Sequence, residues 1–299
     1  MNEAAFLAAL RALPLHPGAA NLRDDTAALA GLTITTDTIV EGVHFLAGDP
    51  PEDVAWKLLA TNLSDLAAKG ATPEGVLLNY PLSDDAWDSA FLAGLDTALR
   101  YFACPLLGGD TVTLPAGAPR ILTLTAVGRD AAAPPRSGAQ AGDALWVTGT
   151  IGDAGTGLAI ARGEDGPPEL LAAYRRPQPR LAEGRALAPL VHAMMDVSDG
   201  LLIDAARMAA ASGIAAAIDL AAIPLSDAYR AFRGDGRAAR LAAATAGDDY
   251  QLLFAAAPDL MPPVPATRIG RFAAGTGLAL TDAGTSIPLP PRLGFEHAI

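Results

Sequence analysis

The chain has 299 residues and a formal charge of −12, and 51% of its residues are hydrophobic. This length favours two domains, and the apolar content excludes wholesale disorder. The negative charge argues against a nucleic-acid partner, and no apolar stretch reaches the roughly 18 residues of a membrane span. The single cysteine, Cys104, excludes an internal disulfide framework and a cysteine-rich zinc site.

The first half of the chain alternates predicted strands and helices. Residues 1–14 predict a helix without a secretion signal, so we expect a cytoplasmic protein. Strands are then predicted at 31–36, 75–80 and 120–128, and helices at 53–69 and 84–103. Gly70 is suited to follow the first of these helices, because glycine readily adopts the left-handed conformation found there. This order of elements indicates an α/β or α+β layer.

A linker is predicted at residues 129–143, which contain paired prolines and many small residues. We therefore expect two domains, 1–136 and 137–299. The second half predicts strands at 144–150, 214–220 and 250–256, and helices at 155–162, 180–194 and 201–211. The glycine-rich turn at 149–158 lacks the Lys-Ser/Thr of a Walker loop, so we interpret it as a strand-to-helix connection whose N–H groups could contact an anion.

Aspartates stand at predicted strand ends, in turns or beside glycines in many separate segments. They are Asp24, Asp25, Asp37, Asp65, Asp110, Asp196, Asp199, Asp248 and Asp249. Carboxylates from such places can converge in one cleft, where divalent cations between them would make their mutual repulsion tolerable. Oxygen ligands without His or Cys favour Mg²⁺ or Mn²⁺, and hence metal-assisted phosphoryl transfer.

Each of these residues also has an ordinary structural interpretation. The aspartate pairs could form turns, Asp65 could pair with Lys69, and Asp110 could shape a turn after two glycines. Asp199 or Ser198 could cap the helix that follows. Clustered aspartates would equally suit a two-metal phosphohydrolase that needs no ATP, or a protein that binds ATP and Mg²⁺ without turnover.

Eight segments taken in order are more specific than any single aspartate. They are RDDTAAL, ITTDTIVEGVHF, KLLATNLSDLAAKGATP, LLGGDT, RSGAQAGD, VTGTIGDAGTGLAI, DVSDGLLID and AGDDYQLLF. This series resembles the thiamine-monophosphate kinase family, in the superfamily of aminoimidazole-ribonucleotide synthetase and selenophosphate synthetase. The resemblance runs from about residue 20 to about residue 256, with a weaker match at residues 294–297.

The resemblance implies ATP-dependent phosphorylation of thiamine monophosphate to thiamine diphosphate with several Mg²⁺ ions. It implies an α/β (α+β) protein with two domains. The N-terminal sheet, with helices on one face, would pair in a homodimer to form a shared β-barrel, and the C-terminal α/β domain would have a mixed sheet. An ATP-using synthetase of the same superfamily is the nearest alternative. Selenophosphate synthetase fits less well, because no cysteine or lysine stands early in the chain.

The resemblance also implies roles for individual residues. The implied metal ligands are Asp25, Thr35, Thr36, Asp37, Asp65, Asp110, Asp196 and Asp199. The implied ATP contacts are Gly109, Asp110, Arg136 and Ser198, and the implied thiamine contacts are His44, Asp248 and Phe295. The residues expected to carry the transfer itself are Asp37, Asp65, Asp110 and Arg136.

The chain departs from the family pattern in three places. Arg23 replaces the glycine of a Gly-Asp-Asp motif, which affects the local backbone and not the carboxylates. Asp248 replaces the glutamate of a Gly-Glu-Asp motif, so that carboxylate is one methylene shorter. The aromatic residue near the end is Phe295, which can stack on a heterocycle but cannot donate a hydrogen bond.

Overall fold

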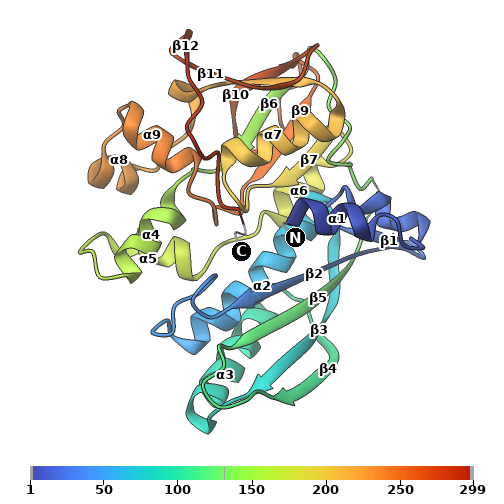
Figure 1. Ribbon diagram of the computed structural model, residues 1–299, viewed down its shortest axis with the longest axis vertical. Coiled ribbons are helices and arrows are strands. Elements are labelled where there is room, and N and C mark those ends of the chain that lie inside the picture. The colour runs from blue at the N-terminus through green and yellow to red at the C-terminus, as the bar shows by residue number, and fades with distance from the viewer. Residues whose placement is uncertain (1–2, 131, 297–299) are drawn as a thin grey trace.

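The computed structural model describes residues 3–130 and 132–296, so His297 in the weaker C-terminal match lies outside the described residues. The chain forms two lobes, each built on its own sheet (Figure 1). The first lobe contains α1 Glu3–Leu10, the 3₁₀ helix η1 Pro17–Leu22, β1 Ala27–Leu29, β2 Leu32–Val40, α2 Pro51–Ala68, β3 Thr72–Leu82, α3 Asp85–Tyr101, β4 Leu106–Thr113 and β5 Ile121–Arg129.

The second lobe begins after residues 130–143, within which the predicted domain boundary falls. It contains β6 Ala144–Thr148, α4 Asp153–Ala161, α5 Pro168–Arg175, α6 Leu181–Leu187, β7 Ala193–Asp196, α7 Leu201–Ser212, β8 Ala215–Asp219, the 3₁₀ helix η2 Leu220–Ala222, α8 Asp227–Arg233, α9 Arg237–Ala244, β9 Leu252–Ala256, β10 Ala266–Ala273, β11 Gly277–Asp282 and β12 Thr285–Ile287.

Both sheets are mixed. Within the described residues the first sheet has the order β1-β2-β5-β3-β4, and the second has the order β12-β11-β8-β10-β6-β9-β7. Only the pairs β3–β4 and β8–β11 are parallel in these two sheets as described. The predicted two-domain α/β fold with mixed sheets is therefore confirmed.

Helix α2 covers one face of the first sheet. Its residues Val54, Leu58 and Leu63 are buried against strand residues such as Leu78 and Leu124. Gly70 follows the helix with a φ of +65°, as the sequence predicts. Along β2, β3 and β5 the residues that point to the other face alternate with the core residues and are exposed or half-buried. The first sheet therefore has one covered face and one open face.

The C-terminal end of α2 also packs against the second lobe, so the helix lies between the two sheets (Figure 1). Ala67 and Ala68 share a buried cluster with Leu187 of α6 and Phe254 of β9. A Cβ atom on Gly184 of α6 would lie 2.0 Å from the Ala67 carbonyl oxygen, so only glycine permits this approach. Side chains on α2 can consequently reach elements of both lobes.

The structure corrects several sequence predictions. Strand β2 runs to Val40, so Asp37 lies inside the strand and not at its end. Strand β4 was not predicted, because Gly108 and Gly109 suggested a turn. The helix predicted at 180–194 ends at Leu187, before Pro189, and its last residues form β7. Helices α8 and α9 and strands β10 to β12 were also not predicted.

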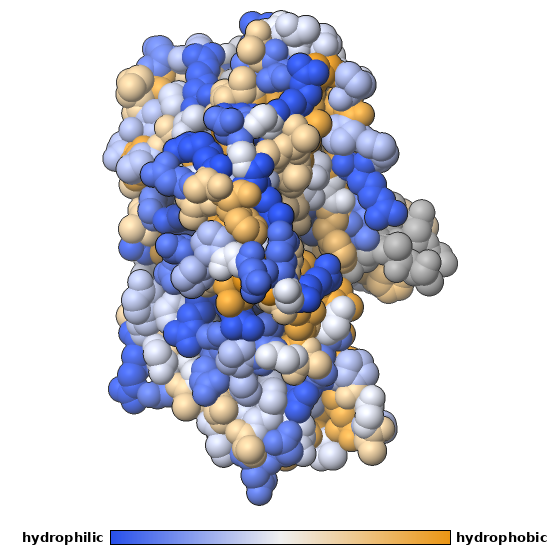
Figure 2. Space-filling model, turned by 90° about the vertical axis from the view of Figure 1, so that its left-hand side faces the viewer, coloured by the Kyte–Doolittle hydropathy of each residue, from blue (hydrophilic) through white to orange (hydrophobic). Residues whose placement is uncertain are grey.

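The surface of the molecule is mixed in character. On the face shown in Figure 2 polar residues predominate, and hydrophobic residues form separate groups. None of the helices in residues 3–130 and 132–296 combines the length and hydrophobicity that a membrane-spanning helix requires.

Candidate active site

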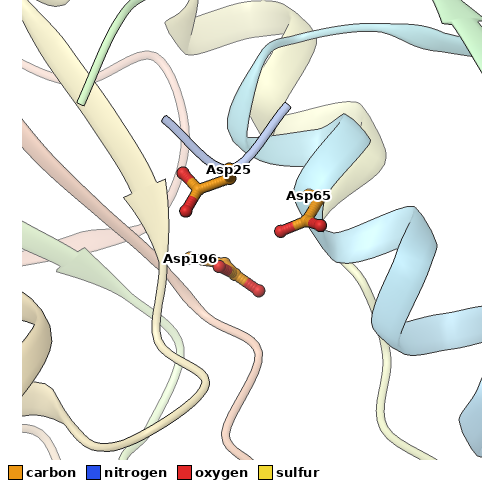
Figure 3. A group of neighbouring side chains, drawn as sticks. All are labelled: Asp25, Asp65 and Asp196. Atoms are coloured by element: carbon orange, nitrogen blue, oxygen red, sulfur yellow. The ribbon is translucent and has the colours of Figure 1, made fainter. Parts of the chain in front are cut away.

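Three carboxylates from separate elements meet between the lobes. Asp25 lies in the turn before β1, Asp65 lies on α2, and Asp196 ends β7. One oxygen of each lies within 4.8 Å of those of the other two, and the side chains point toward one another (Figure 3). Ser64 Oγ donates a hydrogen bond of 2.6 Å to Asp196, and Thr35 of β2 donates one to Asp65. The sequence-predicted convergence of these aspartates is present.

Burial and mutual repulsion raise the pKa values of this acidic cluster. Burial raises the pKa of Asp196 to about 6, and burial with the charges of Asp37 and Asp196 raises the pKa of Asp65 well above its ordinary range. Burial and the charge of Asp199 raise the pKa of Asp37 to about 6. Ionised carboxylates at this spacing destabilise one another unless a cation lies among them.

The donor set fits a hard divalent cation. Asp25 Oδ2 is buried and accepts no hydrogen bond from the described part of the chain, and the Lys69 ammonium lies 3.5 Å away. Such an orphaned oxygen beside two further carboxylates provides the oxygen ligands that Mg²⁺ prefers. Lys69 pairs with Asp24 and not with Asp65, so the helix pair considered as an alternative is not observed. Arg136 forms an ion pair with Asp25.

A cavity of about 540 Å³ opens beside this cluster. The predicted residues that line it are Asp37, His44, Asp65, Asp196, Ser198, Asp199, Asp248 and Phe295. Thr61, Arg162 and Tyr250 line it as well and were not singled out from the sequence. The cavity therefore joins the predicted metal ligands of both lobes to the predicted thiamine contacts.

Asp204 organises the loop that carries Ser198 and Asp199. Its buried carboxylate accepts the backbone N–H groups of Ser198, Asp199 and Gly200 at 3.1, 3.1 and 3.2 Å. Burial raises the pKa of Asp204 to about 7, and Arg207 pairs with both Asp204 and Asp199. Neither Asp199 nor Ser198 caps α7 with its side chain. The sequence signal for Asp204 was its place within DVSDGLLID, but its burial could not be inferred from that segment.

The glycine-rich turn before α4 contacts an anion from the chain itself. The buried Asp249 carboxylate accepts the Gly152 N–H at 2.9 and 3.1 Å. The interpretation of this turn as a strand-to-helix connection agrees with the observed β6 and α4. The two neighbouring aspartates therefore have different roles. Asp248 lines the cavity, and Asp249 holds this turn in place.

Comparison with known proteins assigns the family. The family models AIR synthase related protein, N-terminal domain, and AIR synthase related protein, C-terminal domain, match residues 23–129 and 140–282. The chain is 39% identical over 308 residues to thiamine-monophosphate kinase of Caulobacter vibrioides, covering 94% of this chain and 86% of that protein. It is 40% identical over 287 residues to thiamine-monophosphate kinase of Salmonella typhimurium, covering 89% and 86%.

The chain belongs to the thiamine-monophosphate kinase family. A solved structure of AaThiL complexed with AMPPCP and TMP matches with a TM-score of 0.87 at 29% identity, covering 99% of this chain and 97% of that one. In this member of the thiamine-monophosphate kinase family, Arg23 has a φ of −119°, which any residue can adopt. Its replacement of the family glycine therefore needs no special backbone conformation at that position.

Two family residues do not join the cluster within one chain. Asp37 pairs across the first sheet with Leu124, which pairs with Leu78, which pairs with Gly109. Three strand spacings place the backbones of Asp37 and Gly109 roughly 14 Å apart. Asp110 is the next residue along β4, so its side chain points to the open face of the sheet, and it is exposed.

Thr36 lies on that same open face. Its hydroxyl donates to the Leu124 carbonyl oxygen at 3.2 Å, away from the face that α2 covers. The structure thus brings Asp25, Thr35, Asp37, Asp65, Asp196 and Asp199 to one side of the sheet. The side chains of Thr36 and Asp110 point to the open face, and Gly109 lies three strands away from Asp37, so the predicted residues do not form a single cluster within one chain.

Proposed function

We propose that this protein transfers the γ-phosphoryl group of ATP to the phosphate of thiamine monophosphate, giving thiamine diphosphate and ADP. The observation that carries the proposal is the acidic cluster of Asp25, Asp65 and Asp196 opening on a cavity lined by both lobes. Membership of the thiamine-monophosphate kinase family supports it, as does the likeness to AaThiL complexed with AMPPCP and TMP.

Several Mg²⁺ ions would be held by the carboxylates of Asp25, Asp37, Asp65, Asp196 and Asp199, with Thr35 contributing an oxygen. Bound Mg²⁺ neutralises phosphate oxygens and lets two mutually repelling anions come into line. Hydrogen bonds within the chain support these ligands. Ser64 orients Asp196, and the Asn62 side chain accepts the Asp37 N–H at 3.1 Å, so α2 fixes ligands on both neighbouring strands.

The acceptor needs no general base, because its phosphate oxygen is already anionic at neutral pH. The work of the protein is to hold the two substrates in line and to offset their charge. We assign phosphate neutralisation to Arg136, whose guanidinium is half-buried beside Asp25. Ser198 would contact ATP from its loop. No covalent enzyme intermediate is expected.

The thiamine moiety would lie against His44, Asp248 and Phe295, which line the cavity together. Phe295 is 44% exposed, and its N–H donates to the Asp199 carbonyl oxygen at 2.9 Å. Its backbone is thus held beside a proposed metal ligand, and its aromatic side chain contributes to the lining of the cavity. This arrangement would place the heterocycle next to the phosphate-binding carboxylates.

We further propose a homodimer formed through residues 1–136, in which the open faces of the two first sheets join in a shared β-barrel. Leu77, Val112 and Ile121 on the first sheet are between 42% and 49% exposed, which is costly for apolar side chains unless a partner covers them. Asp110 and Gly109 would then complete the ATP site of the partner subunit. We also propose that the boundary between the two domains follows residue 136 and that the protein is cytoplasmic.

The decisive experiment is a product assay with thiamine monophosphate, ATP and Mg²⁺. Formation of thiamine diphosphate and ADP in equal amounts supports the kinase. Release of inorganic phosphate from thiamine monophosphate without ATP would instead indicate a phosphohydrolase. Turnover of ATP only with the substrate of aminoimidazole-ribonucleotide synthetase would indicate a synthetase of the same superfamily. Either of these two results would refute the proposal.

A further inference from the structure

Lys57 is a buried cation at the thiamine side of the cavity. It lies on α2, eight residues before Asp65, and is 2% exposed. Its ammonium donates to Asp248 Oδ2 at 2.7 Å and to the His44 carbonyl oxygen at 2.9 Å. It also lies 4.1 Å from the centroid of the Tyr174 ring, within cation–π range. Two hydrogen bonds and the contact with the ring thus surround the ammonium with protein groups.

We propose that Lys57 is a positioning residue for the thiamine monophosphate site, acting through Asp248 and the backbone of His44. This inference rests on the proposed function, which gives those two residues their role. Because its side chain is buried, bonded to the protein and not part of the cavity lining, Lys57 would not contact the substrate. It would determine where two groups that face the substrate are held.

The contacts of Asp248 show what Lys57 controls. The Asp248 side chain is 32% exposed and lines the cavity, and its two oxygens have different partners. Oδ2 accepts from Lys57, and Oδ1 accepts from the Tyr250 hydroxyl at 3.0 Å. Both oxygens are therefore anchored, and the carboxylate has one orientation toward the cavity. A carboxylate one methylene shorter than the family glutamate depends more on such an anchor to keep its reach.

The backbone of Asp248 is also constrained. Its φ is +62°, a left-handed conformation that residues other than glycine adopt at an energetic cost. The Asp248 N–H donates to the Ser198 carbonyl oxygen at 2.7 Å, which ties this turn to the loop of the proposed ATP contact. Strain of this kind persists where surrounding contacts determine the conformation, and the Lys57 ion pair is one of those contacts.

His44 is held at two points. Its carbonyl oxygen accepts from Lys57, and its Nδ1 accepts the Val40 N–H at 3.0 Å. With Nδ1 as an acceptor, the proton of the neutral ring is on Nε2. Lys57 therefore links two proposed thiamine contacts that come from different lobes, His44 before α2 and Asp248 before β9.

The test compares steady-state kinetics of the wild type with the K57M variant. We expect K57M to raise the KM for thiamine monophosphate roughly tenfold or more, since it removes a charge-assisted hydrogen bond, and to leave the KM for ATP within about twofold. K57R should recover part of the loss, because a guanidinium can still donate to Asp248. The matched control is Y174F, which loses the hydrogen bond to Asp49 but keeps the ring beneath the ammonium.

A double-mutant cycle separates positioning from general support of the fold. If Lys57 acts in part through Asp248, K57M combined with D248N should raise the KM for thiamine monophosphate by clearly less than the product of the two single effects. Independent effects that multiply, or an unchanged KM in folded K57M, would overturn the inference. Should K57M not fold, the same cycle with K57R decides by the same criterion. A wild type that forms no thiamine diphosphate would refute the proposed function instead, so the two failures are distinct.

Discussion

Replacing Asp196 with asparagine should stabilise the metal-free protein while abolishing its activity. Asp196 is 3% exposed, and one of its oxygens lies within 4.8 Å of oxygens of Asp25 and Asp65. Its hydrogen bond from Ser64 can be kept by the asparagine carbonyl oxygen. The substitution therefore removes a buried charge without leaving a polar partner unsatisfied.

The size of the effect follows from the pKa of Asp196. A rise from 3.8 to about 6 corresponds to about 3 kcal/mol at roughly 1.36 kcal/mol per pKa unit. Because the folded state holds the proton more tightly than the unfolded state, the wild type without metal loses stability as the pH rises from about 4 to about 6. Asparagine does not ionise, so D196N should be more stable at pH 8 by up to about 3 kcal/mol. This advantage should disappear near pH 4.

The assay is urea unfolding in EDTA at pH 8 and pH 4, together with turnover of thiamine monophosphate in Mg²⁺. We expect D196N to gain stability at pH 8, to show no stabilisation by Mg²⁺, and to lose at least about a hundredfold in rate. The control is D227N, because the Asp227 side chain is 97% exposed and does not belong to the cluster of Asp25, Asp65 and Asp196. A D196N protein less stable than wild type at pH 8 would show that these carboxylates do not repel one another, and the argument for a cation site would fail.

Three further outcomes are expected. D65N and D37N should each lower kcat by orders of magnitude while the protein still folds, and near-normal turnover in both at saturating Mg²⁺ would remove them from the metal site. F295A should raise the KM for thiamine monophosphate more than the KM for ATP, whereas equal effects would count against stacking. L77D on the open sheet face should yield monomers in light scattering and lose activity, while L92D on α3, where Leu92 is 59% exposed, should leave the dimer intact.

Much of the fold could be predicted because its strands and helices have regular hydrophobic spacing. Helix α2 has buried residues at helical intervals and a glycine after its end, and both signals are local. Strand β4 has no regular pattern of buried residues that would reveal it. It is an edge strand exposed on both faces, and it contains two glycines. The predicted helix at 180–194 was wrong in its second half because the short buried strand β7 continues an apolar run that periodicity alone cannot distinguish from a helix.

The candidate site could be predicted only in part, for a similar reason. Aspartates beside turns and glycines can be identified from sequence, and Asp25, Asp65 and Asp196 do meet. Residues that orient them carry no such signal. Lys57 has the spacing of an ordinary core position on α2, and Asp204 has that of an ordinary first-turn carboxylate, but each becomes informative once its burial and partners are known. The face of the sheet to which Asp110 points could not be predicted, because the strand that contains it, β4, was not predicted.

Helix α2 sets the distance between the two ends of the proposed substrate. Lys57 and Asp65 are eight residues apart, which is roughly 12 Å along a helix axis. Lys57 anchors the residues proposed for the heterocycle, and Asp65 belongs to the cluster proposed for the phosphates. Because α2 is buried between the two sheets, this spacing is fixed by the core and not by a loop. A substrate with a heterocycle at one end and a phosphate at the other would therefore be aligned by a single rigid element, which is what an in-line transfer between two anions requires.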